Sequence, residues 1–262
     1  MQHLTAFIAH CYIKGSAAST VRTAVSALSF VFQLGAFTDI TQHIIVKKIL
    51  QGFQKIKPSS DARLPITPNI LKFLLQALEH TTSSFFTKLL LRAMFLVAFC
   101  AFLCVGEITK TSGTTQHYIL FGNVVLKSDA LNQYIELSIP HFKHSKSPIT
   151  TIRLHQNKTN SDLCPHQALI KYLNIRKHDS PSHPLLPFMD GTYVSRQYFT
   201  QQLRLPLSFC NLSLNQYQTH SFRIGAATTA AARGYSELQI QNMGRWKSNA
   251  FRKYIRIPTF EL

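Results

Sequence analysis

Acidic residues are scarce in this chain of 262 residues. Eleven Asp and Glu stand against 28 Lys and Arg, which gives a formal net charge of +17 and an isoelectric point near 9.9. Such an excess favours a polyanionic partner, and nucleic acid is the commonest one because basic side chains that neutralise phosphates release condensed counterions. A basic solvated surface and contact with an acidic membrane face are the alternatives, and no basic run is long enough to decide between them.

The chain also lacks a long apolar run. The longest uninterrupted one covers residues 93–105, which is too short for a membrane-spanning helix of about 20 residues and is typical of a buried core helix. The first residues, MQHLTAFIAHCYIKG, lack the charged start and the long apolar stretch of a secretory signal. We therefore expect no membrane span and no secretion.

Cysteines are few and do not form an obvious pairing pattern. There are five, scattered along the chain, and only Cys100 and Cys104 have a spacing near that of zinc ligands. Both lie inside the apolar run, so we expect buried, reduced thiols and no metal site. The sequence thus predicts a protein of the nucleus or the cytoplasm.

Glycine and proline contents are ordinary, which argues against disorder and repeat arrays, and the length favours two domains. Residues 1–57 have the pattern of a small basic helical domain. One amphipathic helix is expected to begin at Ser19 and end at Gly35, and a second to cover residues 44–56. The apolar face of the first carries Val21, Val25, Leu28 and Phe32, and the polar face of the second carries Lys47, Lys48 and Lys55.

Residues 58–68 contain prolines, serines and an aspartate without periodicity, which predicts a linker. The remainder, 69–262, begins with two helical segments, the second of which is apolar nearly all round. The short segments YILFGNVVL, NQYIELSI and ITTIRL predict antiparallel strands, and helices return from Pro165, with one capped by Ser195, one ending at Gly234 and one between Ser236 and Gly244. The expected fold class is mainly α with a small antiparallel sheet, an α+β fold.

The segment from Thr219 to Arg256 concentrates residues that can act on a phosphate. His220 and Arg223 are three positions apart, so on a helix they share a face and can converge on one phosphate. Trp246 follows a glycine, and Tyr254 lies on a short basic helix. Taken alone, each residue has an ordinary interpretation, and a lone Tyr254 beside Phe251 is about ten times more often a core aromatic than a nucleophile.

The ordered set, His-x-x-Arg, then Gly-Arg-Trp, then Tyr eight residues after the Trp, resembles the C-terminal half of tyrosine recombinases. HSFRIGAATTAAARG and MGRW…YIR are most similar to the eukaryotic Crypton and DIRS transposon recombinases, and the resemblance covers nearly the whole chain. It implies a SAM-like core-binding domain over 1–57 that grips DNA, a linker over 58–68 and a tyrosine recombinase catalytic domain over 69–262. It also implies double-stranded DNA as the partner and a homotetramer on paired sites.

The resemblance implies a role for each matching residue. Tyr254 would attack a DNA phosphodiester and form a 3′-phosphotyrosyl bond, so that rejoining needs neither ATP nor a metal or other cofactor. Arg223 would bind the non-bridging oxygens through its planar fork of donors, His220 would assist proton transfer, and Trp246 would support Tyr254. A lysine on a strand turn protonates the leaving 5′ oxygen in this family, and Lys146 is its best match, with Lys143 as the fallback. For DNA contacts outside the reaction centre we expect Arg22, Lys47, Lys48, Lys143 and Arg245.

One position departs from the family's pattern. The segment FLCVGEIT resembles the family's segment FLRVGEIT. Cys104 therefore stands where the first catalytic arginine is expected, while the supporting Glu107 is retained. Cysteine supplies no fixed positive charge, and loss of one preorganised donor costs about 10² to 10³ in rate. Lys110, three residues past Glu107, is expected to point elsewhere. Three alternatives stay open: a strand-exchange enzyme or its impaired descendant, a domesticated DNA-binding protein without chemistry, and a protein-interaction scaffold with a basic surface.

Overall fold

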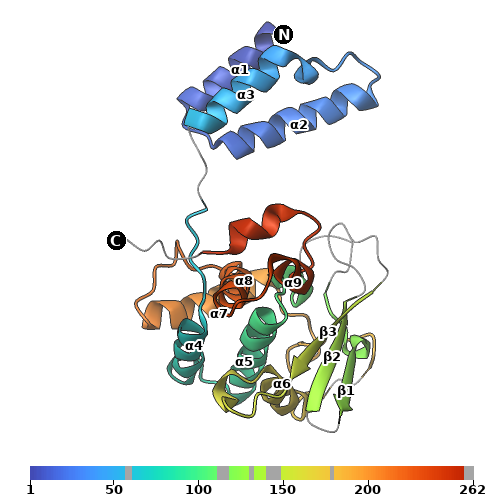
Figure 1. Cartoon of the computed structure of the whole chain (residues 1–262), viewed down its shortest axis with the longest axis vertical. Coiled ribbons are helices and arrows are strands. Elements are labelled where there is room, and N and C mark those ends of the chain that lie inside the picture. Colours follow the sequence, from blue (N-terminus) through green and yellow to red (C-terminus); the bar gives the residue numbers. More distant parts are fainter. Residues whose placement is uncertain (57–60, 111–117, 130–132, 140–148, 178–179, 257–262) are drawn as a thin grey trace. The chain divides into compact units, whose positions relative to one another are not determined.

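The computed structural model describes residues 1–56, 61–110, 118–129, 133–139, 149–177 and 180–256. The chain divides into two compact units, Met1–Ala62 and Arg63–Leu262, which are called unit 1 and unit 2 (Figure 1). The division falls inside the segment 58–68 for which the sequence predicts a linker. Within the described residues, no helix combines the length and the apolar character that crossing a membrane requires.

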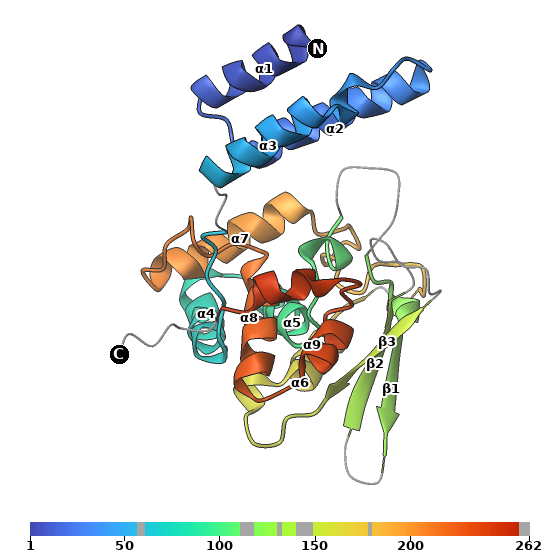
Figure 2. The ribbon, with the colours of Figure 1, turned by 45° about the horizontal axis from the view of Figure 1, so that its top comes forward.

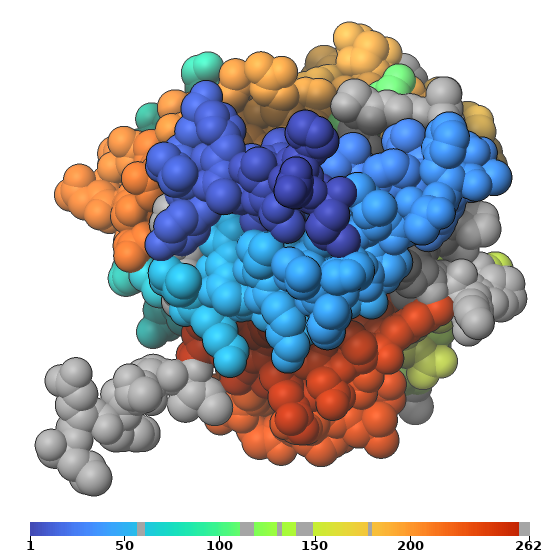
Figure 3. All heavy atoms as spheres, turned by 90° about the horizontal axis from the view of Figure 1, so that it is seen from above, coloured from blue at the N-terminus to red at the C-terminus, as the bar shows by residue number. Residues whose placement is uncertain are grey.

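The part of unit 1 that the structure describes is built from three α-helices and one short 3₁₀ turn. They are α1 (Gln2–Ile13), α2 (Ala18–Leu34), η1 (Ile40–Gln42) and α3 (Ile44–Ile56). Their apolar faces meet in a small core. The space-filling view shows the outer face of this unit in dark to light blue (Figure 3). That core contains Leu4, Ile8, Ala18, Val21, Val25, Val46 and Phe53.

Two details of unit 1 differ from expectation. Helix α2 begins before Ser19, because Ala17 already has the extended conformation of the capping residue. Val21 and Val25 are buried as predicted, but Leu28 is 39% exposed, because the core of the unit covers only the first half of α2. Helix α3 has the predicted bounds, whereas α1 was not predicted.

Unit 2 begins with two helices around which the rest of the unit packs: α4 (Pro68–Thr81) and α5 (Phe85–Cys100). Helix α5 is the centre of the core, since residues from Leu90 to Val97, Arg92 excepted, have no measurable exposure. Phe95 of α5 contacts Phe199 and Phe222 with ring centroids 5.6 and 5.2 Å apart. The prediction of an apolar core helix is therefore confirmed.

The helices that follow in unit 2 pack against α4, α5 or one another (Figure 1). They are α6 (Pro165–Leu173), α7 (Arg196–Phe209), α8 (Ser221–Ala232) and α9 (Glu237–Met243), with the 3₁₀ turns η2 (Val105–Glu107), η3 (Phe121–Asn123), η4 (Ser161–Leu163) and η5 (Asn249–Tyr254). The predicted caps are confirmed, since Ser195 and Ser236 accept backbone hydrogen bonds from Tyr198 and Gln239.

A three-stranded antiparallel sheet lies beside the helices, in the order β1 (Val124–Ser128), β2 (Gln133–Ile139), β3 (Thr150–His155) (Figure 2). In its register Ile135 of β2 faces Leu126 of β1 and Leu154 of β3. The first strand starts later than the segment YILFGNVVL suggested. Residues 121–123 form η3 instead, because the Asn123 side chain accepts a hydrogen bond from the Leu120 amide at 3.0 Å and closes a turn there.

The segment before α4 is part of unit 2. The Ile66 amide donates to the Ser221 carbonyl at 3.0 Å, and the Ile66 side chain is fully buried. The Ile66 backbone lies so close to Gly225 in α8 that a Cβ at residue 225 would be 2.7 Å from the Ile66 carbonyl carbon. This contact fixes the first turn of α8, which carries the residues described next.

Candidate active site

Four residues that the sequence singled out come together in unit 2, and they are called the Tyr254 cluster: His220, Arg223, Trp246 and Tyr254. The Tyr254 ring lies 5.0 Å from the His220 ring and 4.9 Å from the Trp246 ring, measured between centroids. The guanidinium carbon of Arg223 is 4.4 Å from the Trp246 ring and 5.9 Å from the Tyr254 ring. A prospective nucleophile, a guanidinium and an imidazole therefore share one site.

Helix α8 supplies two members of the cluster from its first turn. His220 is the residue that precedes the helix, and Arg223 lies three positions later, so both side chains leave the same face. Arg223 is only 8% exposed. A buried guanidinium acts on an anion without much competition from water, so its charge has a stronger effect here than at the surface.

The hydrogen bonds of Arg223 fix the direction of its guanidinium. Nη1 donates to the Cys104 sulfur at 2.8 Å, and Nη2 donates to the Gly244 carbonyl oxygen. Nε is buried and has no hydrogen-bond partner among the described residues. Leaving a buried donor without a partner costs free energy.

Helix α9 ends so that Trp246 folds back over this site. The amide of Trp246 donates to the Gln241 carbonyl at 3.0 Å and the amide of Arg245 donates to Asn242 at 3.0 Å, which is a Schellman motif. The sequence predicts the stop at Gly244, but Gly244 has a right-handed φ of −85°. Glycine is needed there because a Cβ would overlap the Trp246 indole, and Arg245 takes the left-handed conformation, with φ of 57°.

Tyr254 is held from the other side by η5 and α8. The Thr228 hydroxyl donates to the Tyr254 carbonyl at 3.1 Å and accepts from the Arg256 amide at 3.0 Å. Phe251 is 1% exposed and anchors the turn in a cluster with Ala227 and Ile240. Sequence reasoning missed Thr228, which has no distinguishing pattern, and expected a helix where the chain forms a 3₁₀ turn.

Cys104 lies directly beside Arg223. Burial raises the pKa of the Cys104 thiol, and the nearby Arg223 acts in the opposite direction. Its backbone amide donates to the Glu107 carboxylate at 2.5 Å. The neutral thiol accepts a hydrogen bond from Arg223 and adds no cation to the site.

Arg245, which was expected to contact DNA, is buried instead. Its side chain is 3% exposed, and Nη2 lies 3.0 Å from both oxygens of Glu107, whose side chain is 8% exposed. A guanidinium committed to a buried carboxylate cannot also bind a phosphate at the surface. This expectation is therefore corrected, because the Schellman turn directs the side chain inward.

The remaining candidate residues lie elsewhere. Lys146 and Lys143 are outside the described residues. The Lys110 ammonium lies over the Tyr193 ring, 4.9 Å from its centroid. Arg22, Lys47 and Lys48 are exposed on unit 1, where Arg22 donates to Gln54 at 2.5 Å.

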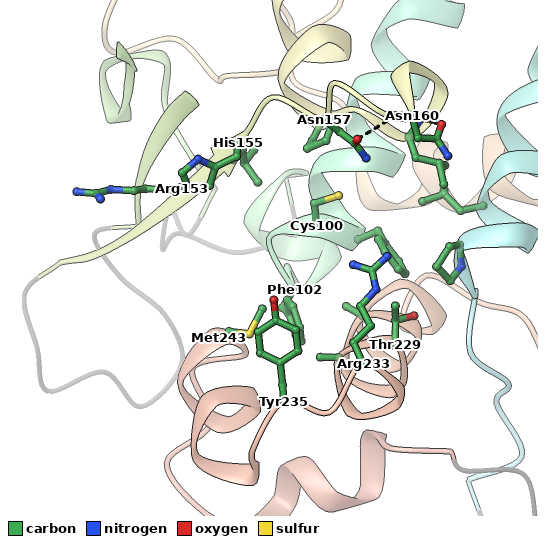
Figure 4. A pocket seen from close by; sticks show the side chains of 18 of the residues that line it. Cys100, Phe102, Arg153, His155, Asn157, Asn160, Thr229, Arg233, Tyr235 and Met243 are labelled. Carbon is green, nitrogen blue, oxygen red and sulfur yellow. Dashed lines mark hydrogen bonds between the residues drawn. The ribbon is translucent and has the colours of Figure 1, made fainter. Parts of the chain in front are cut away.

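A cavity of about 470 Å³ opens in unit 2 between the ends of α5 and α8 and the segment after β3. Arg233 and Tyr235 point into it from one side, and Cys100 lies at its base (Figure 4). It includes none of the Tyr254 cluster. Among the described residues there is no group of His, Cys, Asp and Glu side chains that could hold a metal ion.

Neither a scan against protein-family models nor a search of curated proteins finds a match. Solved structures do match. A lambda integrase dimer bound to a COC′ core site has a TM-score of 0.62 at 16% identity, over 97% of this chain and 64% of that one. XerH site-specific recombinase bound to palindromic difH substrate in a post-cleavage complex has a TM-score of 0.67 at 14% identity, over 96% of this chain and 67% of that one.

Tn1549 transposon integrase in complex with circular intermediate DNA has a TM-score of 0.59 at 12% identity, over 97% of this chain and 80% of that one. This chain thus spans about two thirds of the lambda integrase and XerH chains. The likeness extends over both units and agrees with the mainly helical fold and its small antiparallel sheet. The chain therefore has the fold of the tyrosine recombinases.

Proposed function

We propose that this protein cleaves and rejoins DNA strands through a covalent bond to Tyr254. The observation that carries the proposal is the Tyr254 cluster, in which the guanidinium carbon of Arg223 lies 5.9 Å from the Tyr254 ring and 4.4 Å from the Trp246 ring. The fold and the net charge of +17 support DNA as the substrate.

The reaction would proceed by in-line displacement at phosphorus. The Tyr254 oxygen forms a bond to the scissile phosphorus, the bond from phosphorus to the 5′ oxygen breaks, and the phenolic proton passes to His220 or to water. The leaving 5′ oxygen takes a proton from Lys146, the residue that the family resemblance assigns. The reverse attack by a 5′ hydroxyl releases Tyr254, so the energy of the phosphodiester is conserved.

Arg223 would stabilise the charge that develops on the non-bridging oxygens. Its Nε has no partner within the described protein, and its two Nη atoms are already oriented by Cys104 and Gly244. Preorganised donors of this kind contribute because they need no rearrangement as the charge develops. Trp246 holds the guanidinium on one side through a cation–π contact.

Cys104 favours a second candidate function, a DNA-binding protein with little or no chemistry. The missing arginine removes one donor from the phosphate, which costs about 10² to 10³ in rate. We infer that the chain descends from a eukaryotic transposon recombinase of the Crypton or DIRS type, acts in the nucleus and assembles on paired DNA sites. This lineage rests on the sequence motifs alone.

The test uses the full chain and a pool of nicked duplexes of random sequence, from which bound DNA is first selected. Cleavage near the nick releases a short fragment that carries the 5′ hydroxyl needed for rejoining. The protein therefore stays attached to the DNA, and the adduct is seen on a denaturing gel. We expect a slow adduct with the wild type and none with Tyr254→Phe, which should bind DNA equally well. An adduct that persists in Tyr254→Phe would refute the proposal. Binding without any adduct, in both the wild type and Cys104→Arg, would favour the second candidate.

A further inference from the structure

Two helix ends meet beside the Tyr254 cluster, and both have an unusual residue in the same position. After α5, Phe102 has a left-handed φ of 51°, and the Leu103 amide reaches back to the Ala98 carbonyl at 2.9 Å. After α9, Arg245 has a φ of 57° in the equivalent place. Glycine is the usual residue at this position of a Schellman motif because it has no Cβ to disfavour a positive φ.

The guanidinium of Arg245 joins the two helix ends. Nη1 donates to the Ala101 carbonyl at 3.1 Å, and Nη2 donates to the Phe102 carbonyl at 3.4 Å and to both Glu107 oxygens at 3.0 Å. Glu107 in turn accepts the Cys104 amide. We call this set the Arg245 lock: Arg245, Glu107 and the turn from Ala101 to Cys104.

Both ends of the Arg245 lock touch the Tyr254 cluster. Trp246, the next residue after Arg245, contacts Tyr254 at 4.9 Å and lies over Arg223. On the other side, the Phe102 ring meets Trp246 edge-on at 6.3 Å, and Cys104 accepts a hydrogen bond from Arg223. The lock therefore joins the two turns between which the guanidinium of Arg223 is held.

We propose that Arg245 is a positioning residue, which holds the Cys104 turn and Trp246 on either side of Arg223 so that Arg223 faces the Tyr254 ring. Its relevance to strand cleavage rests on the proposed function. Arginine suits this task because its planar fork reaches a carboxylate and two carbonyls at once, whereas the ammonium of lysine is a compact charge on a flexible stem. A backbone position that favours glycine carries arginine here, which points to the side chain as the reason.

The alternative is an ordinary buried ion pair that only stabilises the core. Such pairs can often be replaced by neutral groups without loss of the fold. The double variant Glu107→Gln with Arg245→Gly removes both charges and places at 245 the residue that its φ prefers. If the pair is only part of the core, this variant should leave the Tyr254 cluster unchanged.

Trp246 is the single tryptophan of the chain, so its fluorescence reports on this turn alone. For the double variant, and for Arg245→Lys, we expect a red-shifted emission and stronger quenching by acrylamide, with the helical circular dichroism and cooperative unfolding retained. The matched control is Glu79→Gln with Lys88→Gln, which removes an ion pair of 3.0 Å between α4 and α5. The control should keep the wild-type emission.

Adduct formation on nicked duplex gives the second readout. Because a misplacement of about 1 Å in an active site can cost about 10² in rate, we expect the double variant to form the adduct about 10²-fold more slowly at saturating DNA, with unchanged DNA affinity. If the wild type forms no adduct, the proposed function fails. The Trp246 emission of the variants then still tests whether Arg245 positions Trp246.

Two results would overturn the inference. One is a folded double variant with wild-type Trp246 emission and, where an adduct forms, the wild-type rate. The other is a double variant that does not fold while its control does, because the pair would then serve the fold of unit 2 rather than the geometry of the site.

Discussion

At the scale of single residues, the site is defined by what surrounds the guanidinium of Arg223. A sulfur, a carbonyl oxygen, an indole and a phenol ring lie around it, and only Nε is left without a partner among the described residues. The neutral thiol of Cys104 accepts from Arg223 without competing for an incoming anion. On the proposed function, this guanidinium binds the phosphate, and the site has one cation fewer than the pattern that the family resemblance implies.

Replacing Cys104 with arginine should restore that cation. We expect Cys104→Arg to form the tyrosyl–DNA adduct about 10² to 10³ times faster than the wild type, because it adds a donor at the developing charge. Without DNA, it should lower the melting temperature, since the new guanidinium would lie beside Arg223 with no anion between them. Rates are measured in single turnover on nicked duplex, with Cys104→Ala as the control. An arginine variant no faster than the alanine variant would show that the site has lost more than one donor.

The thiol of Cys100, which is half-buried beside the cavity, gives a prediction about pH. Burial raises the pKa of Cys100 to about 12, so at pH 8 its thiolate fraction is about one in 10⁴, and the thiolate is the reactive form. We expect Cys100 to resist iodoacetamide at pH 8 in the folded protein and to react increasingly as the pH rises toward 12. Mass spectrometry of the peptides measures this, with urea-unfolded protein as the reference. Rapid labelling of Cys100 in the folded protein at pH 8 would contradict the expectation.

The proximity of the site residues was predictable from the sequence where side-chain types recur in a fixed order. His220, Arg223, Trp246 and Tyr254 are brought together as the motif suggested. The role of Arg245 was not predictable, because whether an arginine points to solvent or inward depends on the φ angle of one turn residue. The same holds for Gly244, whose neighbour Trp246 folds back onto it only in three dimensions.

At the scale of the elements, helix α8 depends on a close backbone approach. A Cβ at Gly225 would be 2.7 Å from the Ile66 carbonyl carbon and 3.0 Å from the Ile66 nitrogen, and backbone atoms cannot move aside as a side chain can. The segment before α4 therefore packs against α8 only because residue 225 is glycine.

Gly225→Ala should consequently destabilise unit 2. We expect a loss of about 1–3 kcal/mol from overpacking, although alanine favours helices, and a melting temperature lower by several degrees. Gly52→Ala in α3 is the control, because nothing lies within 4 Å of its Cβ and helix propensity alone should make it neutral or stabilising. Thermal unfolding measures both variants. An unchanged melting temperature for Gly225→Ala would mean that the segment around Ile66 shifts freely.

Most elements could be predicted because their apolar periodicity and caps are local properties. Helix α3 and the caps of α7 and α9 followed from spacing and from single serines. The start of β1 could not be predicted, because the turn at 121–123 depends on hydrogen bonds from Asn123 and on the approach of Pro181 to Gly122. Helix α1 was missed since its apolar residues do not concentrate strongly on one face.

At the scale of the whole molecule, the net charge of +17 is the main property that the sequence predicts for DNA binding. Of the predicted DNA contacts, Arg22, Lys47 and Lys48 are exposed on unit 1, while Arg245 is buried. Electrostatic contacts of exposed lysines with phosphates should appear as a dependence of affinity on salt concentration.

We expect the double variant Lys47→Gln with Lys48→Gln to bind duplex DNA more weakly than the wild type. The slope of log affinity against log salt should fall in magnitude by about 2, because each phosphate that a lysine no longer neutralises removes roughly 0.9 from it. Fluorescence anisotropy at several salt concentrations measures the slope. The variant Glu79→Gln with Lys88→Gln keeps the net charge and should keep the slope. If the lysine variant has the wild-type slope, α3 does not face the DNA.

The central claim is that Tyr254 is the residue that becomes joined to DNA. The most direct measurement is to recover the protein–DNA adduct formed on nicked duplex by Cys104→Arg, digest it with nuclease and trypsin, and locate the nucleotide by mass spectrometry. We expect the nucleotide on the peptide that contains Tyr254, through its phenolic oxygen. A nucleotide on any other residue, or no adduct from a variant that binds the duplex, would contradict the claim.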